Sequence, residues 1–125
     1  MRNKCSVAVF FVSTYVKLQQ AYAAESNAAG GWTLIGYTAP GTNGVTTNFT
    51  YTGTIDVDGS TANATADAWK AAPNVDLNDC ASSGSSWQVK VTPGDGGSVA
   101  FDATITESTA GACQALTPTF TKIGR

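Results

Sequence analysis

The sequence predicts an α+β fold, in which an N-terminal α-helix packs on an antiparallel β-sheet of about four strands. Two observations lead to this prediction. Apolar residues recur with helical spacing near the N-terminus, and beyond the glycine pair Gly30-Gly31 they alternate with polar residues as in strands. A helix followed by a run of strands favours an α+β arrangement over alternating βαβ units. With 125 residues, the chain has the length of a single domain.

The predicted helix covers residues 4–29. Phe11, Tyr15, Leu18 and Tyr22 follow one another at the spacing of a single helix face. The glycine pair that follows offers the positive φ of a helix C-cap. We therefore expect these four side chains to form the packing and assembly face of an amphipathic helix. The chain then divides into this helix (1–29) and a β-sheet head (30–125).

Several later segments carry strand patterns. The clearest is a hairpin at residues 87–105, whose apolar and polar residues alternate on both sides of a glycine-rich turn at 93–97. A second alternation runs from residue 46 to residue 57 and places threonines on one face. We further expect a short apolar stretch opening the strand region at 32–37, a polar connector at 58–68 and an edge strand at 116–123.

The charge and composition of the chain exclude several classes of function. Charged residues make up 13% of the chain, the formal net charge is −2, and there is no histidine. This composition is unlike that of a basic nucleic-acid binder, so no nucleic-acid partner is expected. The absence of histidine excludes a Ser–His nucleophile and removes the commonest general base. We therefore predict a structural or binding protein that is not an enzyme.

The chain has three cysteines, Cys5, Cys80 and Cys113. Its Ser-, Thr- and Asn-rich composition, poor in lysine, suggests an exported protein, in which disulfides persist. We predict a disulfide between Cys80 and Cys113 and a free thiol at Cys5. The alternative is two unpaired buried thiols. Three scattered cysteines without histidine do not supply a four-ligand zinc site, and no metal or cofactor is predicted.

Two pairs of aspartates leave calcium binding open. Asp56 and Asp58 precede a glycine, as in a fragment of a calcium loop, whereas Asp76 and Asp79 lie just before Cys80. A full calcium loop needs further oxygen ligands that the first pair lacks. A turn at the end of a strand explains that pair equally well.

Four stretches of the chain carry a family resemblance. They are residues 15–22, 31–37, 69–80 and 112–118. Together they resemble the type IV pilins and the type II secretion pseudopilins of bacteria, over about residues 12–125. The resemblance implies a long N-terminal helix on a four-stranded antiparallel sheet. It also implies a C-terminal loop closed by two cysteines, which Cys80 and Cys113 would match.

The resemblance further implies a filament subunit. Its partners would be copies of itself or other pilin-like subunits, together with the inner-membrane assembly machinery. Its place would be an extracellular filament, the periplasm or the cell surface of a bacterium. Pilins begin with a processing site after a glycine and an apolar run of about twenty residues, whereas residues 1–11 are too short for such a run. The helix is therefore expected to be truncated, with membrane contact only if a missing N-terminal helix is supplied.

A secreted carbohydrate- or surface-binding module is the alternative. Arg2 and Lys4 form a basic start, an apolar centre follows, and Ala21-Tyr22-Ala23 resembles a cleavage site, which would make residues 1–23 a signal peptide. The polar residues between the apolar centre and this site favour the amphipathic helix instead. A sugar-stacking platform would use large aromatic side chains, although such residues at strand positions more often belong to the core. The candidates for it are Trp32, Trp69 and Trp87.

Overall fold

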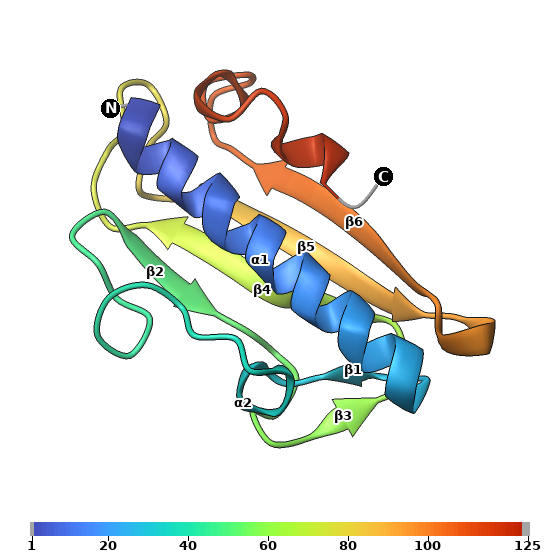
Figure 1. The fold of residues 1–125 in the computed structure, drawn as a ribbon. Helices are drawn as coiled ribbons and strands as arrows, with labels where there is room; N and C mark the ends of the chain where they lie inside the picture. The colour runs from blue at the N-terminus through green and yellow to red at the C-terminus, as the bar shows by residue number, and fades with distance from the viewer. Residues whose placement is uncertain (1, 124–125) are drawn as a thin grey trace.

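The computed structural model describes the backbone of residues 2–123 and the side chains of residues 12–123. A long helix, α1 (Arg2–Ser26), lies diagonally across one face of a four-stranded antiparallel sheet (Figure 1). The predicted α+β arrangement is confirmed. The helix ends earlier than residue 29, because Asn27 adopts a φ of 56° and its N–H donates to the Ala23 carbonyl at 2.9 Å. Asn27 therefore takes the positive-φ position that the sequence pattern predicts at the glycine pair.

The main sheet has the strand order β2-β4-β5-β6. Its strands are β2 (Phe49–Thr52), β4 (Thr65–Pro73), β5 (Ser86–Pro93) and β6 (Val99–Thr106). Strands β5 and β6 form the predicted hairpin, and they pair without interruption from Ser86 opposite Thr106 to Pro93 opposite Val99. A short 3₁₀-helix, η1 (Asp95–Gly97), turns the chain between them.

A second, two-stranded sheet lies at the C-terminal end of α1 (Figure 1). It pairs β1 (Ala29–Gly30) with β3 (Ser60–Thr61). Between them in the sequence, the predicted strand region 32–37 forms one helical turn, α2 (Trp32–Ile35), so the strand expectation is wrong there. Gly36 ends this turn with a φ of 81°, and its N–H donates to helix carbonyls. An apolar run this short does not distinguish a strand from a buried helical turn.

The polar connector predicted at 58–68 is also wrong, since it contains β3 and the start of β4. A β-bulge hides the strand pattern. The β4–β5 register shifts between Thr65 and Trp69, and Asp67 within the bulge has a φ of 55°. As a result Ala68 and Trp69, which are neighbours in the chain, are both buried. A bulge breaks the period of two on which a sequence-based strand prediction depends.

The alternation from 46 to 57 is a strand only over β2. The chain leaves the sheet at Gly53, where an added Cβ would lie 2.7 Å from the indole nitrogen of Trp32. That nitrogen donates to the Ala68 carbonyl at 3.1 Å, so the Trp32 ring occupies the space beside Gly53. Beyond this point Ile55 is only partly buried, and Val57 is 54% exposed.

The predicted edge strand at 116–123 is wrong as well. The segment instead contains two 3₁₀-turns, η2 (Gln114–Leu116) and η3 (Phe120–Lys122). Phe120 is buried, and its ring lies 6.2 Å from that of Trp69 on β4. The C-terminal segment therefore contributes the Phe120 side chain to the core.

The core lies between α1 and the inner face of the main sheet and is rich in aromatic side chains. Phe49 packs edge-to-face on Trp87 with ring centroids 5.6 Å apart, and burial of such rings supplies a large part of the stabilisation. The opposite face of the sheet carries mostly polar side chains. One row across all four strands, fixed by the strand register, shows this pattern: Thr52, Lys70, Gln88 and Thr104.

Candidate functional site

The predicted assembly face of α1 is turned towards the molecule's own core. Tyr15 is fully buried, and Leu18 and Tyr22 pack partly buried against the core cluster. The side chain of Phe11, the fourth member of this face, lies outside the described residues, as does that of Cys5. The tyrosine stripe therefore attaches the helix to the head. Among the described side chains of α1, the exposed ones are Lys17, Gln20, Ala21, Ala24, Glu25 and Ser26.

A buried glutamine on the helix is a feature that the sequence analysis missed. Gln19 has no exposed surface, and its side-chain nitrogen donates to the Gly30 carbonyl at 2.8 Å and to the Tyr15 hydroxyl at 2.9 Å. The Gly30 N–H in turn donates to the Gln19 side-chain oxygen at 2.8 Å. The one available signal was its position, four residues after Tyr15 on the buried side.

The tyrosine hydroxyls continue this polar network inside the core. The indole nitrogen of Trp69 donates to the Tyr37 hydroxyl at 3.0 Å, and the Tyr15 and Tyr37 rings meet edge-to-face at 5.4 Å. Burial raises the pKa of Tyr15 and of Tyr37 to about 12. Both hydroxyls are therefore neutral at physiological pH, as hydrogen-bonding groups in a closed core should be.

The disulfide between Cys80 and Cys113 is present. Both cysteines are completely buried, and their Cα atoms lie 4.7 Å apart. The bridge joins the loop that follows β4 to the segment that follows β6, across a sequence separation of 33 residues. The prediction of this pair is confirmed.

A carboxylate organises the loop that leads to Cys113. Glu107 accepts backbone N–H groups from Gly111 at 2.6 Å, from Cys113 at 2.8 Å and from Gln114 at 3.2 Å. These hydrogen bonds, that of Gly111 foremost, lower the pKa of Glu107. On the other side of the disulfide, the Asp76 carboxylate accepts the Ser82 N–H at 2.8 Å, which likewise lowers its pKa. Both carboxylates serve to hold loops.

The aspartates considered for calcium lie in turns. The Gly59 N–H donates to the Asp56 carbonyl at 2.8 Å, which makes residues 56–59 a tight turn between β2 and β3. Asp76 is occupied by the Ser82 amide, as described above. Within the described part of the chain, no group of three or more His, Cys, Asp or Glu side chains is placed to hold a metal ion.

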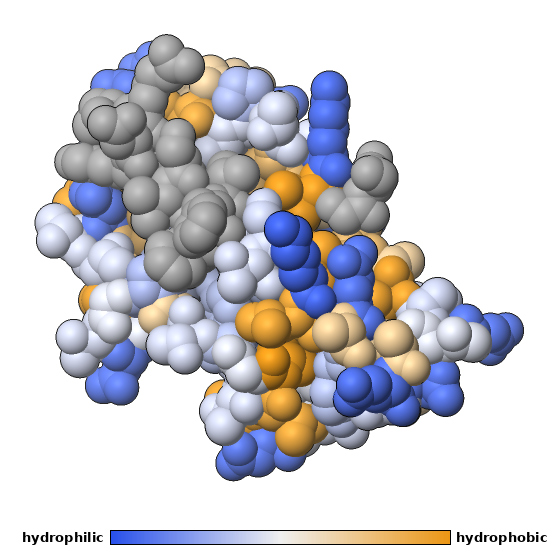
Figure 2. Space-filling model, viewed as in Figure 1, coloured by the Kyte–Doolittle hydropathy of each residue, from blue (hydrophilic) through white to orange (hydrophobic). Residues whose placement is uncertain are grey.

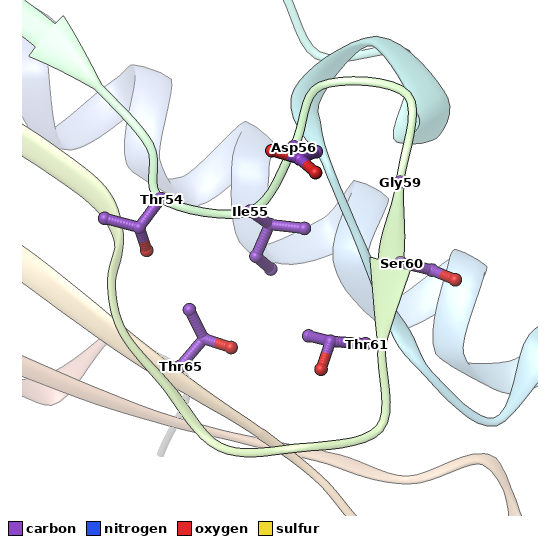
Figure 3. A pocket seen from close by; sticks show the side chains of 7 residues that line it. All are labelled: Thr54, Ile55, Asp56, Gly59, Ser60, Thr61 and Thr65. Atoms are coloured by element: carbon purple, nitrogen blue, oxygen red, sulfur yellow. The ribbon is translucent and has the colours of Figure 1, made fainter.

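A polar hollow of about 260 Å³ opens between the turn at residues 56–59, β3 and the start of β4 (Figure 3). Three threonines surround Ile55 in it, and each of their hydroxyls is already hydrogen-bonded to backbone at residues 63–66. Thr54 donates to the Ala66 carbonyl, Thr65 donates to the Asn63 carbonyl, and Thr61 accepts the Asn63 N–H. The hydroxyls therefore stabilise the loop.

The tryptophans do not form an exposed platform. Trp69 and Trp87 are buried in the core, where the indole nitrogen of Trp87 donates to the Thr117 hydroxyl at 2.7 Å. Trp32 is half-buried and packs edge-to-face on Tyr37 at 5.0 Å. Two of the three rings that a sugar would need are thus unavailable.

Apolar side chains reach the surface around α2. Leu34 is 42% exposed, and its N–H donates to the carbonyl of Val57, itself more than half exposed. Figure 2 shows apolar residues gathered where the C-terminal half of α1 meets α2. Among the described residues, no helix combines the length and apolarity needed to cross a membrane.

Comparison with known proteins found no matching family model, no matching curated protein and no matching solved structure.

Proposed function

We propose that this chain is a structural subunit of a bacterial filament of the type IV pilus or type II secretion pseudopilus kind. One observation carries the proposal. A 25-residue helix lies across a four-stranded antiparallel sheet, and a disulfide closes the C-terminal segment beside it. This is the combination that the resemblance in the sequence implies. The role is that of a building block and not of a catalyst.

In this proposal α1 has two faces with different tasks. One face holds the helix on the head through Tyr15 and Gln19, so that the two parts move as a unit. The other face, exposed through Lys17, Ala21 and Ala24, is available to the helices of neighbouring subunits. On the described part of this face, Ala21 and Ala24 would supply the apolar surface that assembly buries between helices.

The surface of the head suits close packing between copies. Charged residues make up 13% of the chain, and the sheet face away from α1 carries mostly neutral hydroxyl and amide groups. Removing such groups from water costs less than removing ions. Leu34 and Val57 add exposed apolar area beside α1. The proposed setting is an extracellular or periplasmic filament, with other pilin-like subunits and an inner-membrane machinery as partners.

Immunogold electron microscopy of the host bacterium tests the proposal. Antibodies against the chain should label filaments along their length, and deletion of its reading frame should remove the labelled filaments. Ala21→Cys, in a Cys5→Ser background, should cross-link neighbouring subunits through their helices. Thr52→Cys, on the far face of the sheet, is the matched control. Label confined to soluble monomer, with equal cross-linking of the two variants, would contradict a filament role.

The position of the mature N-terminus separates this proposal from the secreted binding module. Cleavage after Ala23 would remove Val12, Tyr15 and Gln19, all three of which have no exposed surface. The loss of so much core disfavours residues 1–23 as a signal peptide. N-terminal sequencing of exported protein should therefore find α1 retained, whereas a new terminus at Ala24 would favour the module.

A further inference from the structure

The two edge strands of the main sheet, β2 and β6, differ in whether another segment pairs with their outer side. At β2 the preceding segment covers the edge, since Val45 forms an antiparallel bridge with Thr50 and the Tyr51 N–H donates to the Gly44 carbonyl at 2.7 Å. At the other side of the sheet, β6 is the outermost strand (Figure 1). Among the described residues, none outside β5 forms a backbone hydrogen bond with the outward-facing positions of β6.

The hairpin geometry identifies those outward-facing positions. The Gly94 N–H donates to the Ser98 carbonyl at 2.9 Å, and in an antiparallel ladder hydrogen-bonded pairs alternate with non-bonded ones. The even-numbered residues of β6 therefore bond to β5. Pro93, which has no N–H, agrees with this assignment because it lies opposite an odd-numbered residue, Val99. The N–H and C=O groups that point away from the sheet belong to Val99, Phe101, Ala103 and Ile105.

The side chains of β6 do not protect this edge. Exposed edge strands are usually made unattractive for pairing by lysine, proline, a bulge or a short length. Strand β6 is eight residues long, its pairing with β5 has no bulge, and it contains neither proline nor glycine. Asp102 is its one charged residue. The segment before β2 covers the β2 edge, whereas no described segment pairs with the outer side of β6. The β6 edge is therefore the one available for strand pairing.

We propose that β6 pairs antiparallel with β6 of a second copy about a two-fold axis at Ala103, which joins the two main sheets into one. Residues directly opposite each other in such a pair place their side chains on the same face of the sheet. An axis at Ala103 sets Phe101 opposite Ile105, both on the core side. It sets Asp102 opposite Thr104, both on the outer side.

The charge on β6 selects this register over its nearest competitor. An axis at Asp102 would keep the same faces together but would place the two Asp102 carboxylates directly opposite each other, which is destabilising. An axis at Ala103 instead keeps the two carboxylates apart, each opposite Thr104 of the other copy. A two-fold contact is closed and does not propagate. The inference therefore goes beyond the filament role and does not depend on it.

Analytical ultracentrifugation of the full chain over a wide concentration range tests the proposal. The wild-type protein should show a reversible monomer–dimer equilibrium. Thr104→Lys places a cation opposite Asp102 of the other copy, twice per dimer, and should tighten association roughly twofold to thirtyfold. Thr104→Asp should weaken association by a similar factor. Thr104 is exposed, so neither variant disturbs the core.

Thr52 provides the matched control, because it is exposed on the same face and in the same cross-strand row but lies on β2. Thr52→Lys and Thr52→Asp change the net charge equally and should leave the equilibrium unchanged. A wild-type protein that stays monomeric at every concentration would overturn the proposal. Equal responses at positions 52 and 104 would do the same.

A cross-linking experiment fixes the register. In a Cys5→Ser background that keeps Asp102, a mixture of Ala100→Cys and Thr106→Cys proteins should form a disulfide-linked heterodimer, because an axis at Ala103 sets these two exposed positions opposite each other. Even positions are non-hydrogen-bonded in the new pair, where Cα atoms lie about 4.5 Å apart, within the range of a disulfide. A mixture of Ala100→Cys and Thr104→Cys proteins, which an axis at Asp102 would set opposite each other, should not cross-link. Efficient cross-linking of that second mixture would contradict the axis at Ala103.

Discussion

The Gln19 side chain binds both backbone groups of Gly30. It donates to the Gly30 carbonyl and accepts the Gly30 N–H, each at 2.8 Å, across eleven residues of sequence. Gly30 belongs to β1, the strand that pairs with β3, so this amide connects α1 to the smaller sheet. At Gly30 the Gln19 side chain thus makes the two backbone hydrogen bonds that a neighbouring β-strand would otherwise make.

We expect Gln19→Met to destabilise the fold by about 2–4 kcal/mol, because it leaves the buried N–H and C=O of Gly30 without partners at nearly constant side-chain volume. Chemical denaturation followed by circular dichroism measures the change in the free energy of unfolding. Gln20→Met, on the exposed side of the same helix, is the control and should have little effect. Similar stabilities for the two variants would refute the role assigned to Gln19.

The buried disulfide should stabilise the head mainly by restricting the unfolded chain. Replacing both Cys80 and Cys113 by alanine should cost about 3–4 kcal/mol for a loop of this length. The midpoint of denaturant unfolding should fall accordingly. Cys5→Ser, which keeps the bridge, serves as the control. A double variant that unfolds at the wild-type midpoint would show that the loops are held without the bridge.

Glu107 should make the stability of the C-terminal loop sensitive to acid. Its folded-state pKa lies below the ordinary value, so its contribution is present above the unfolded-state pKa and is lost as pH falls through the folded-state pKa. Melting temperatures measured from pH 7 downwards should therefore drop as Glu107 takes up its proton. Glu107→Gln should lower the melting temperature at pH 7 and flatten this acid loss. Asp58→Asn, which removes an exposed carboxylate from another turn, is the matched control.

The β5–β6 hairpin could be predicted because all of its information is local. Its two strands pair in one uninterrupted register, so the alternation in the sequence is the alternation in the sheet. In β4 the bulge at Asp67 shifts the pattern, and small alanines at buried positions resemble a polar connector. A bulge is visible only when the partner strand is known.

The role of Gln19 could not be predicted from the pattern of the helix for a similar reason. In the sequence alone, a glutamine beside an apolar stripe reads as a break in the buried face of the helix. Its hydrogen-bonding partner here is the backbone of Gly30, which only the structure shows. The cysteine pair was predictable because composition and family resemblance agreed on it. The open β6 edge on which the dimer proposal rests depends on strand order, which no local pattern specifies.

Gly31 lies between β1 and α2, in close contact with the turn that leads to β3. A Cβ at this position would lie 1.8 Å from the Asp56 carbonyl oxygen, and a backbone atom cannot move aside as a flexible side chain can. The Gly31 N–H also donates to the Gly59 carbonyl at 2.8 Å, which fixes the two segments against each other. Gly31→Ala should therefore cost about 3 kcal/mol through overpacking.

Gly36 is the matched comparison for Gly31, because it lies at the other end of α2 in open space but with a φ of +81°. Gly36→Ala should cost only the strain of the left-handed conformation, about 1 kcal/mol. Denaturant unfolding of both variants separates close approach from backbone strain. The larger loss should belong to Gly31→Ala, and hydrogen exchange should show the β1–β3 pair opening first in that variant. If Gly36→Ala proves the more damaging, the contact between Gly31 and Asp56 does not hold the smaller sheet in place.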